Sequence, residues 1–235
     1  MDSAFAEAFE TTWPAAEYAD TGGFRVGRGL GAGGRVSSAR VIGPWTADDI
    51  AAVEDISRNW DQPPMFRVLD EDAPLAAALQ QAGYRSEKPT VNMSAPLDGL
   101  TDIPIPPVTT FSVWPPLAIQ REIWVAGNIG PARQAVMDHA DLPKTSILGR
   151  TNDRAAGTGF VAIANQVAMI HAVEVRAEWR RRGLAGWMIR EAAFWARDNG
   201  ATRMGLAVTR ANTGAIAAYR GLRFQEVAAY SYYTR

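Results

Sequence analysis

The sequence contains no cysteine and only two histidines among 235 residues. Disulfides, thiolate metal sites and a cysteine nucleophile are therefore excluded, and we expect no metal centre. No apolar run approaches the roughly 20 residues that span a bilayer. The acidic start, MDSAFAEAFETTWPA, lacks the basic region of a signal peptide. These absences predict a cytoplasmic globular protein with no membrane partner.

An excess of either charge is also missing, because 24 basic side chains stand against 25 acidic ones, a formal net charge of −1. A non-specific nucleic-acid binder usually carries a broad basic surface. The balance therefore predicts no nucleic-acid partner, and any anion site must be local. The hydrophobic share of 47% is enough to bury the core of one large domain or two small ones.

The proline-rich stretch DGLTDIPIPPV, residues 98–108, predicts a connector between parts at 1–100 and 105–235. Before it we expect an irregular β region up to about residue 45, a helix over about 47–59, a short helix ending near Gly83, and a strand. After it we expect a strand, two helices and three strands, then a helix over about 182–198, a strand, a helix and a last strand. This order predicts an α/β fold of the α+β type, a mixed sheet with helices on its faces.

One stretch combines a glycine turn with a run of arginines. The β-branched strand MIHAVEV enters the turn RAEWRRRGLAG, which opens the long helix. Such a helix start offers free backbone N–H groups and the positive end of the helix dipole to a phosphate. Gly183 allows the backbone to approach a ligand, and the arginines add charge-assisted hydrogen bonds. A merely solvated helix start is the alternative.

A second motif follows in NTGAIAAYRGLRF, where Asn212 and Tyr219 stand seven residues apart on one helix face. This motif and the spacing Arg180-x-x-Gly183-x-Ala185, in this order and strand–helix context, resemble the GNAT superfamily of acyl-CoA-dependent N-acyltransferases over roughly residues 105–235. The family usually has glycine where this chain has Arg223. TTWPA and GRVSSA resemble the front part of bacterial two-part proteins of this type. The resemblance implies a GNAT-like fold preceded by a smaller, degenerate GNAT-like half.

The resemblance also implies acetyl-CoA as co-substrate and a set of residues that bind it. The backbone of Val173 and Val175, in the strand MIHAVEV, would bind the pantetheine arm and polarise the thioester carbonyl. Tyr219 would protonate the departing thiolate, and a core tyrosine is the alternative. Asn212 would contact the cofactor or only cap its helix. The full cofactor-binding set is Val173, Val175, Arg180, Arg181, Arg182, Gly183, Leu184, Ala185, Gly186, Asn212, Ala215 and Tyr219.

An acceptor amine is protonated at neutral pH, so the reaction needs a base. His171 is the first candidate because imidazole titrates in the useful range, and a packed core histidine is the alternative. Strand alternation puts His171, Val173 and Val175 on one face and Glu174, the second candidate base, on the other. A β-bulge in this strand would change that assignment.

The segments LQQAGYRSEKPTVNMSA and YRGLRFQEVAAYSYYTR indicate an internal repeat. Aligning Tyr84 with Phe224 sets Leu79 opposite Tyr219, so the first half would lack the hydroxyl.

The sequence as a whole predicts an N-acetyltransferase that passes an acetyl group directly to a primary amine of a small-molecule or peptide acceptor in a ternary complex. A non-catalytic acyl-CoA sensor or interaction module is the alternative. A tRNA-dependent aminoacyl transferase is disfavoured by the charge, and a homodimer is left open.

Overall fold

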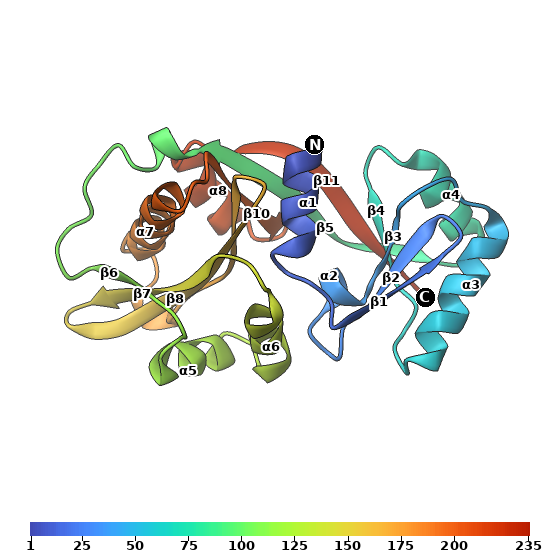
Figure 1. The fold of residues 1–235 in the computed structure, drawn as a ribbon, viewed down its shortest axis with the longest axis horizontal. Coiled ribbons are helices and arrows are strands. Elements are labelled where there is room, and N and C mark those ends of the chain that lie inside the picture. Colours follow the sequence, from blue (N-terminus) through green and yellow to red (C-terminus); the bar gives the residue numbers. More distant parts are fainter. The chain divides into compact units, whose positions relative to one another are not determined.

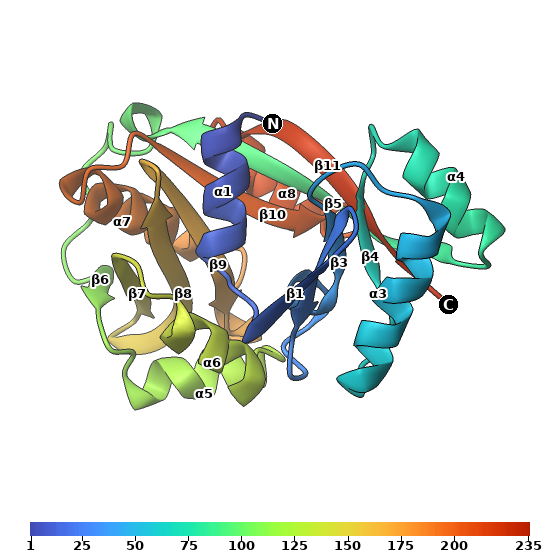
Figure 2. The same ribbon diagram turned by 45° about the vertical axis from the view of Figure 1, so that its right-hand side comes forward.

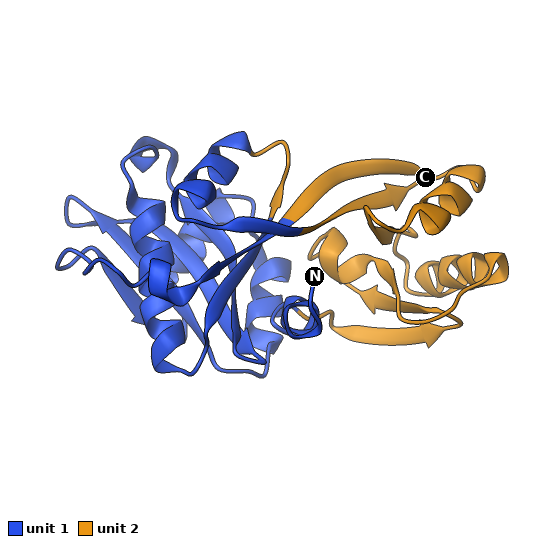
Figure 3. Ribbon diagram, turned by 90° about the horizontal axis from the view of Figure 1, so that it is seen from above, with its two compact units in different colours: residues 1–13, 92–207, 213–227 blue, residues 14–91, 208–212, 228–235 orange.

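A computed structural model describes residues 1–235. The chain forms two compact units, coloured separately in Figure 3. Unit 1 contains residues 1–13, 92–207 and 213–227, and unit 2 contains residues 14–91, 208–212 and 228–235. The predicted parts at 1–100 and 105–235 are continuous segments, whereas each of these units combines three separate segments of the chain. The N-terminal helix α1 (Ser3–Thr11) belongs to unit 1, although it precedes all of unit 2 in sequence.

Unit 1 is a mixed sheet with helices on both faces. Its strands lie in the order β5-β10-β9-β8-β7-β6. They are β5 (Arg85–Pro96), β6 (Thr110–Val113), β7 (Lys144–Thr151), β8 (Arg154–Ala164), β9 (Val167–Val175) and β10 (Arg203–Thr209). Strands β6 to β9 are antiparallel neighbours, and β9 and β10 are parallel. Short 3-10 turns occur at Leu97–Gly99 and Ala177–Trp179.

Helix α7 (Leu184–Asp198) covers one face of this sheet, and α5 (Ala118–Ala126) and α6 (Pro131–His139) cover the other (Figure 1). Two glycines allow α7 to pack closely on the strands. A Cβ at Gly149 would lie 2.6 Å from the Sδ of Met188, and one at Gly157 would lie 2.8 Å from it. Helix α8 (Thr213–Gly221) leads into the last strand, β11 (Gln225–Thr234).

Unit 2 has a core of its own. Its strands are β1 (Glu17–Thr21), β2 (Phe24–Arg28), β3 (Ala39–Val41) and β4 (Phe66–Leu69), and its helices are α2 (Gly34–Ser37), α3 (Ala47–Asn59) and α4 (Ala73–Gln81). β3 and β4 are parallel and are joined through α3 (Figure 2). The aromatic rings of Phe24, Phe66 and Tyr84 meet edge to face at its centre, with centroids 5.5 and 5.3 Å apart.

The repeated segments share their local geometry and exchange their last strands. Tyr84 N donates to Leu79 O at 2.9 Å, and Phe224 N donates to Tyr219 O at 3.0 Å. Residues 92–96 of β5 belong to unit 1, where Ser94 Oγ donates to Met204 O of β10, whereas residues 228–234 of β11 belong to unit 2 and pair with β4. The chain therefore passes between the units within these long strands.

The prediction for the first 45 residues is partly wrong, because Ser3–Thr11 form a helix. Asp2 caps it by accepting from Phe5 N at 3.1 Å, and its apolar face buries Phe5, Ala8 and Phe9. An aspartate cap followed by apolar residues at helical spacing is a helix signal that these residues display, and the glycine-rich stretch that gave the β prediction begins only after it. None of the helices has the length and apolar character that crossing a membrane requires.

Candidate active site

The start of α7 is open to solvent and is not capped by any side chain. Gly183 precedes the first helical residue with a φ of +82°, a left-handed conformation that glycine adopts without strain. A Cβ built there would meet no atom within 4 Å. Because the first N–H groups of a helix have no partner inside it, those of Gly183, Leu184 and Ala185 are the donors that an anion would use here.

The three arginines of the turn differ in what they contact. Arg180 is tied to the end of β9, because its Nε donates to Val175 O at 2.8 Å and its Nη2 to Glu174 Oε1 at 2.9 Å. Arg182 lies over the ring of Trp179, with Cζ 4.9 Å from the centroid. Arg181 is exposed and has a φ of +63°. Arg180 thus shapes the turn, and Arg181 and Arg182 supply its charge.

The strand leading into this turn separates from its neighbour. β9 and β10 are paired only from Val167 to Met169 and from Arg203 to Gly205. β9 then continues to Val175 without β10 beside it. Backbone groups of β9 near Val173 are therefore available for another partner, as the resemblance implies, whereas Val175 O already accepts from Arg180.

A β-bulge in β9 overturns the predicted faces. Phe160 of β8 stands opposite His171, and Thr158 stands opposite Glu174. One residue separates the two positions on β8 but two separate them on β9, so β9 contains one extra residue, at Ala172, whose φ is +51°. Directly paired residues share a face. His171 and Glu174 therefore lie on the same face, the one covered by α5, and the prediction from simple alternation is wrong.

The valines lie on the other face of β9, under α7. A Cβ at Gly159 would lie 3.7 Å from Val173 Cγ2, and one at Gly157 would lie 3.3 Å from Val175 Cγ2. Both glycines also face Met188 of α7. The two predicted bases and the two valines thus lie on opposite faces of one strand.

The bulge is held by Trp124 of α5, which is completely buried. Its Nε1 donates to Ala172 O at 2.8 Å. We expect Trp124→Phe to lower the free energy of unfolding by about 2–4 kcal/mol, because it removes a buried hydrogen bond and leaves a cavity. Urea unfolding would measure this, with Trp179→Phe, a partly exposed tryptophan, as the control. Equal stability of the two variants would contradict the prediction.

His171 is buried, with 7% of its surface exposed. Its Nε2 lies 2.9 Å from the hydroxyl of Thr12, directly after α1. Its ring lies against Trp13 and Phe160, with centroids 5.1 and 6.1 Å away. The stretch TTWPA contains Thr12 and Trp13, but nothing in the sequence indicated that they lie beside His171, because pattern alone assigned this stretch to the other domain.

Glu174 is the second candidate base. Its side chain is 17% exposed and is ion-paired with Arg180 at 2.9 Å. It packs on Gly127, just after α5, where a Cβ would come within 2.5 Å of Glu174 Cγ. The carboxylate is therefore held at the end of β9 by the turn on one side and by α5 on the other.

Tyr219 lies on α8, with its ring 5.9 Å from that of Phe224. Burial raises the pKa of its hydroxyl to about 12, because desolvation disfavours the tyrosinate. The phenol therefore keeps its proton throughout the neutral range. Arg223, where the related proteins usually have glycine, takes a left-handed φ of +66°, so the turn after α8 forms despite the substitution.

Asn212 is exposed and directly precedes α8, and its backbone N donates to Thr209 O at 2.9 Å. It belongs to residues 208–212 of unit 2, whereas Ala215 and Tyr219 belong to unit 1. Gly186 completes the first turn of α7 by donating to Gly183 O at 3.0 Å. The predicted set thus comes from β9, the turn, α7, and α8 together with the residue that precedes it.

The corresponding helix of unit 2 has a different start. α3 also connects two parallel strands, but Asp49 in its first turn accepts from Thr46 N at 2.8 Å. Asp48 adds a second negative charge there. These carboxylates occupy the positive end of the helix dipole and would repel a phosphate. Of the starts of α3 and α7, only that of α7 is suited to an anion.

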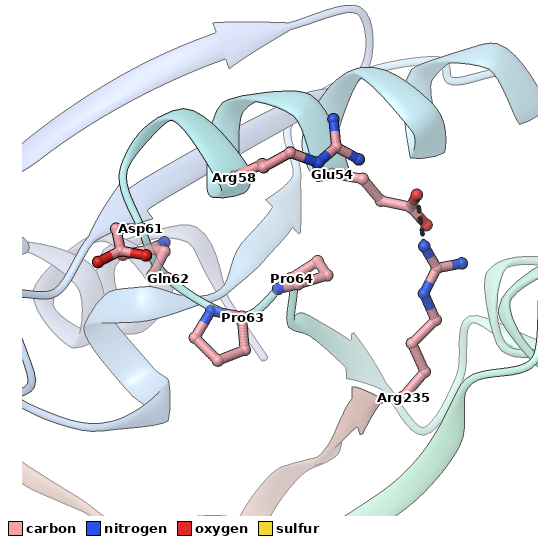
Figure 4. A pocket seen from close by; sticks show the side chains of 7 residues that line it. All are labelled: Glu54, Arg58, Asp61, Gln62, Pro63, Pro64 and Arg235. Carbon is pink, nitrogen blue, oxygen red and sulfur yellow. Dashed lines mark hydrogen bonds and ion pairs between the residues drawn. The ribbon is translucent and has the colours of Figure 1, made fainter.

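Two cavities contain charged residues. One of about 360 Å³ in unit 1 adjoins the first turn of α7, with Arg150, Arg182 and Trp187 in its wall. Another, of about 530 Å³, lies in unit 2 (Figure 4). In that one Arg235 pairs with Glu54 at 2.7 Å, and no predicted site residue takes part. The structure contains no group of three or more His, Asp or Glu side chains arranged to hold a metal.

Residues 116–224 match the sequence profile of the Acetyltransferase (GNAT) family. No curated protein matches the chain. Among solved structures, a GCN5-related N-acetyltransferase from Kribbella flavida is similar, with a TM-score of 0.69, 18% identity, and 99% of this chain and 93% of that one covered. A functionally unknown conserved protein from Staphylococcus epidermidis is similar with a TM-score of 0.69 and 10% identity, and the match covers 95% of this chain and 94% of that one. A tandem GNAT protein from the clavulanic acid biosynthesis pathway is similar with a TM-score of 0.62 and 15% identity, and the match covers 95% of this chain and 84% of that one.

At these identities the structural likeness shows the fold alone, and that fold is the mixed α/β fold of GNAT proteins over nearly the whole chain, with two GNAT-like halves. The profile match adds the family of the second half. The chain contains a domain of the GNAT acetyltransferase family at residues 116–224. The predicted family and fold class are thereby confirmed.

Proposed function

We propose that the protein is an N-acetyltransferase that moves an acetyl group directly from acetyl-CoA to a primary amine of a small molecule or peptide, with both substrates bound at once. The observation that carries the proposal is the uncapped start of α7 at Gly183, which directly follows the unpaired end of β9. A turn of this kind suits a pyrophosphate, and an unpaired strand edge suits the amide groups of a pantetheine arm.

Acetyl-CoA, when bound, supplies an activated acetyl thioester. The N–H groups at Gly183, Leu184 and Ala185 would hold its pyrophosphate, and Arg181 and Arg182 would add positive charge beside it. A backbone N–H of β9 near Val173 would polarise the thioester carbonyl. The open space in front of Gly183 fits this assignment, because a side chain there would occupy the position proposed for the phosphate.

Protons move at two places in the proposed reaction. The ammonium of the acceptor gives up one proton to a base, His171 or Glu174, and a second as its nitrogen is acylated. Tyr219, which burial keeps protonated, donates one proton to the sulfur of CoA and is reprotonated by the second proton from the nitrogen. The net products are the acetylated amine, CoA with its thiol restored, and one proton released to solvent.

A non-catalytic acyl-CoA-binding protein is the second candidate, and one observation favours it. Both proposed bases already have partners, since His171 contacts Thr12 and Glu174 is ion-paired with Arg180. Protonation of Glu174 would weaken its ion pair with Arg180, and burial restricts the access of an acceptor amine to His171. This arrangement would suit a domain that binds acyl-CoA without turning it over.

Release of CoA distinguishes the two candidates. Because the protein has no cysteine, a thiol reagent added to a reaction mixture reads only free CoA. We would first titrate acetyl-CoA into the protein by calorimetry, then screen arylalkylamines, polyamines, amino sugars and peptides for amine-dependent thiol release. We expect micromolar binding and release with at least one class. Binding without release would favour the sensor, and no binding would rule out both.

A further inference from the structure

We propose that Thr12 is a positioning residue that holds His171 in the tautomer with its proton on Nε2, which makes Nδ1 the basic nitrogen of the site. The role of that nitrogen as a base rests on the proposed function. The tautomer itself does not. Thr12 follows the N-terminal helix α1, and 159 positions separate it from His171 in the sequence.

The position of the proton follows from counting hydrogens. A threonine hydroxyl has a single proton, and Thr12 Oγ1 donates it to Ala8 O at 2.6 Å. At its contact of 2.9 Å with His171 Nε2, the hydroxyl oxygen is therefore the acceptor. His171 must carry a proton on Nε2 to make this bond. In the neutral ring the second nitrogen, Nδ1, then holds the lone pair.

The surroundings keep the ring in this orientation. Thr12 is completely buried, so water does not compete for its hydroxyl. Trp13 and Phe160 flank the imidazole, the latter nearly parallel to it at an interplanar angle of 25°. Glu174, the charged residue on the same face of β9, has Arg180 as its partner.

This arrangement resembles the way in which an orienting group prepares a histidine base in other enzymes. A partner that accepts from one ring nitrogen fixes which nitrogen is basic, and it also stabilises the imidazolium that forms when the base takes up a proton. Thr12 would do this through a neutral hydroxyl. The N-terminal segment thereby contributes to the chemistry of a domain that begins about a hundred residues later.

Nitrogen NMR tests the tautomer directly. The chain has only one other histidine, the exposed His139, so His139→Gln leaves a single ring to observe. In this background we expect Nε2 to be protonated and Nδ1 unprotonated at neutral pH. Thr12→Val should remove the preference, and Thr12→Ser, which keeps the hydroxyl, should retain it. A ring protonated on Nδ1 alone, or an unchanged tautomer in Thr12→Val, would overturn the proposal.

Turnover tests the consequence for catalysis. We expect Thr12→Val to lower kcat by on the order of tenfold without changing the affinity for acetyl-CoA, and Thr12→Ser to restore it. An equal loss in both variants would contradict a positioning role. If the wild type transfers no acetyl group to any amine, the proposed function fails, and the NMR result still decides the tautomer. Should Thr12→Val not fold, the wild-type spectrum and Thr12→Ser remain decisive.

Discussion

Gly183→Glu should abolish acetyl-CoA binding, weakening it by more than about 100-fold if the pyrophosphate lies at the start of α7. The new carboxylate would stand in the open space before the first helical N–H groups. There it would repel the phosphates and occupy the helix dipole itself. Calorimetric titration of acetyl-CoA into the variant measures the loss.

The chain offers a matched control in Gly200. It also has a left-handed backbone, with a φ of +85°, and also has nothing within 4 Å of an added Cβ, but it follows the other end of α7. Gly200→Glu therefore introduces the same charge and the same backbone strain away from the turn. We expect its affinity for acetyl-CoA to equal that of the wild type. Equal affinity in Gly183→Glu would mean that the arginine turn serves another purpose.

Tyr219→Phe should lower kcat by about 10²- to 10⁴-fold, the usual contribution of a positioned acid, while the dissociation constant of acetyl-CoA stays the same. The ring and its contact with Phe224 remain, so only the proton donor is lost. Steady-state kinetics across a pH series would measure this, together with calorimetry. Tyr18→Phe, which removes a phenol from unit 2, is the control.

The pH dependence of the wild type provides a separate check on Tyr219. Its pKa is raised to about 12 by burial. The acid form is therefore fully populated below about pH 11 and is lost only as the pH rises through the pKa of about 12. If kcat of the wild type falls at some pH below 11, we therefore expect the same fall in Tyr219→Phe, because Tyr219 does not titrate there. If kcat is the same in the variant at every pH, Tyr219 is not the acid.

Periodicity and turn chemistry were sufficient to predict much of the fold. The helix α3 has the predicted bounds, α7 begins within two residues of its predicted start, and the strands β9, β10 and β11 follow in the predicted order. These elements depend on hydrogen bonds between neighbours in sequence and on apolar spacing, which a sequence displays directly. The turn before α7 belongs with them, because a left-handed glycine and an uncapped helix start are local features.

The candidate bases show where local pattern was insufficient. Alternation separated His171 from Glu174, and one extra residue at Ala172 puts them on the same face. That bulge is held by Trp124, 48 positions earlier in the chain. A partner at such a distance leaves no signal in the five or six letters of the strand itself.

The sequence by itself determined that the protein has no cysteine thiol, that a GNAT-like turn stands between a strand and a helix, and that a tyrosine follows on the next helix. Tertiary structure alone decided that α1 joins unit 1, that Thr12 contacts His171, and that the two halves exchange their last strands. The physical reason is that backbone preferences act over a few residues, whereas faces, bulges and buried partners are chosen by packing between segments that folding brings together.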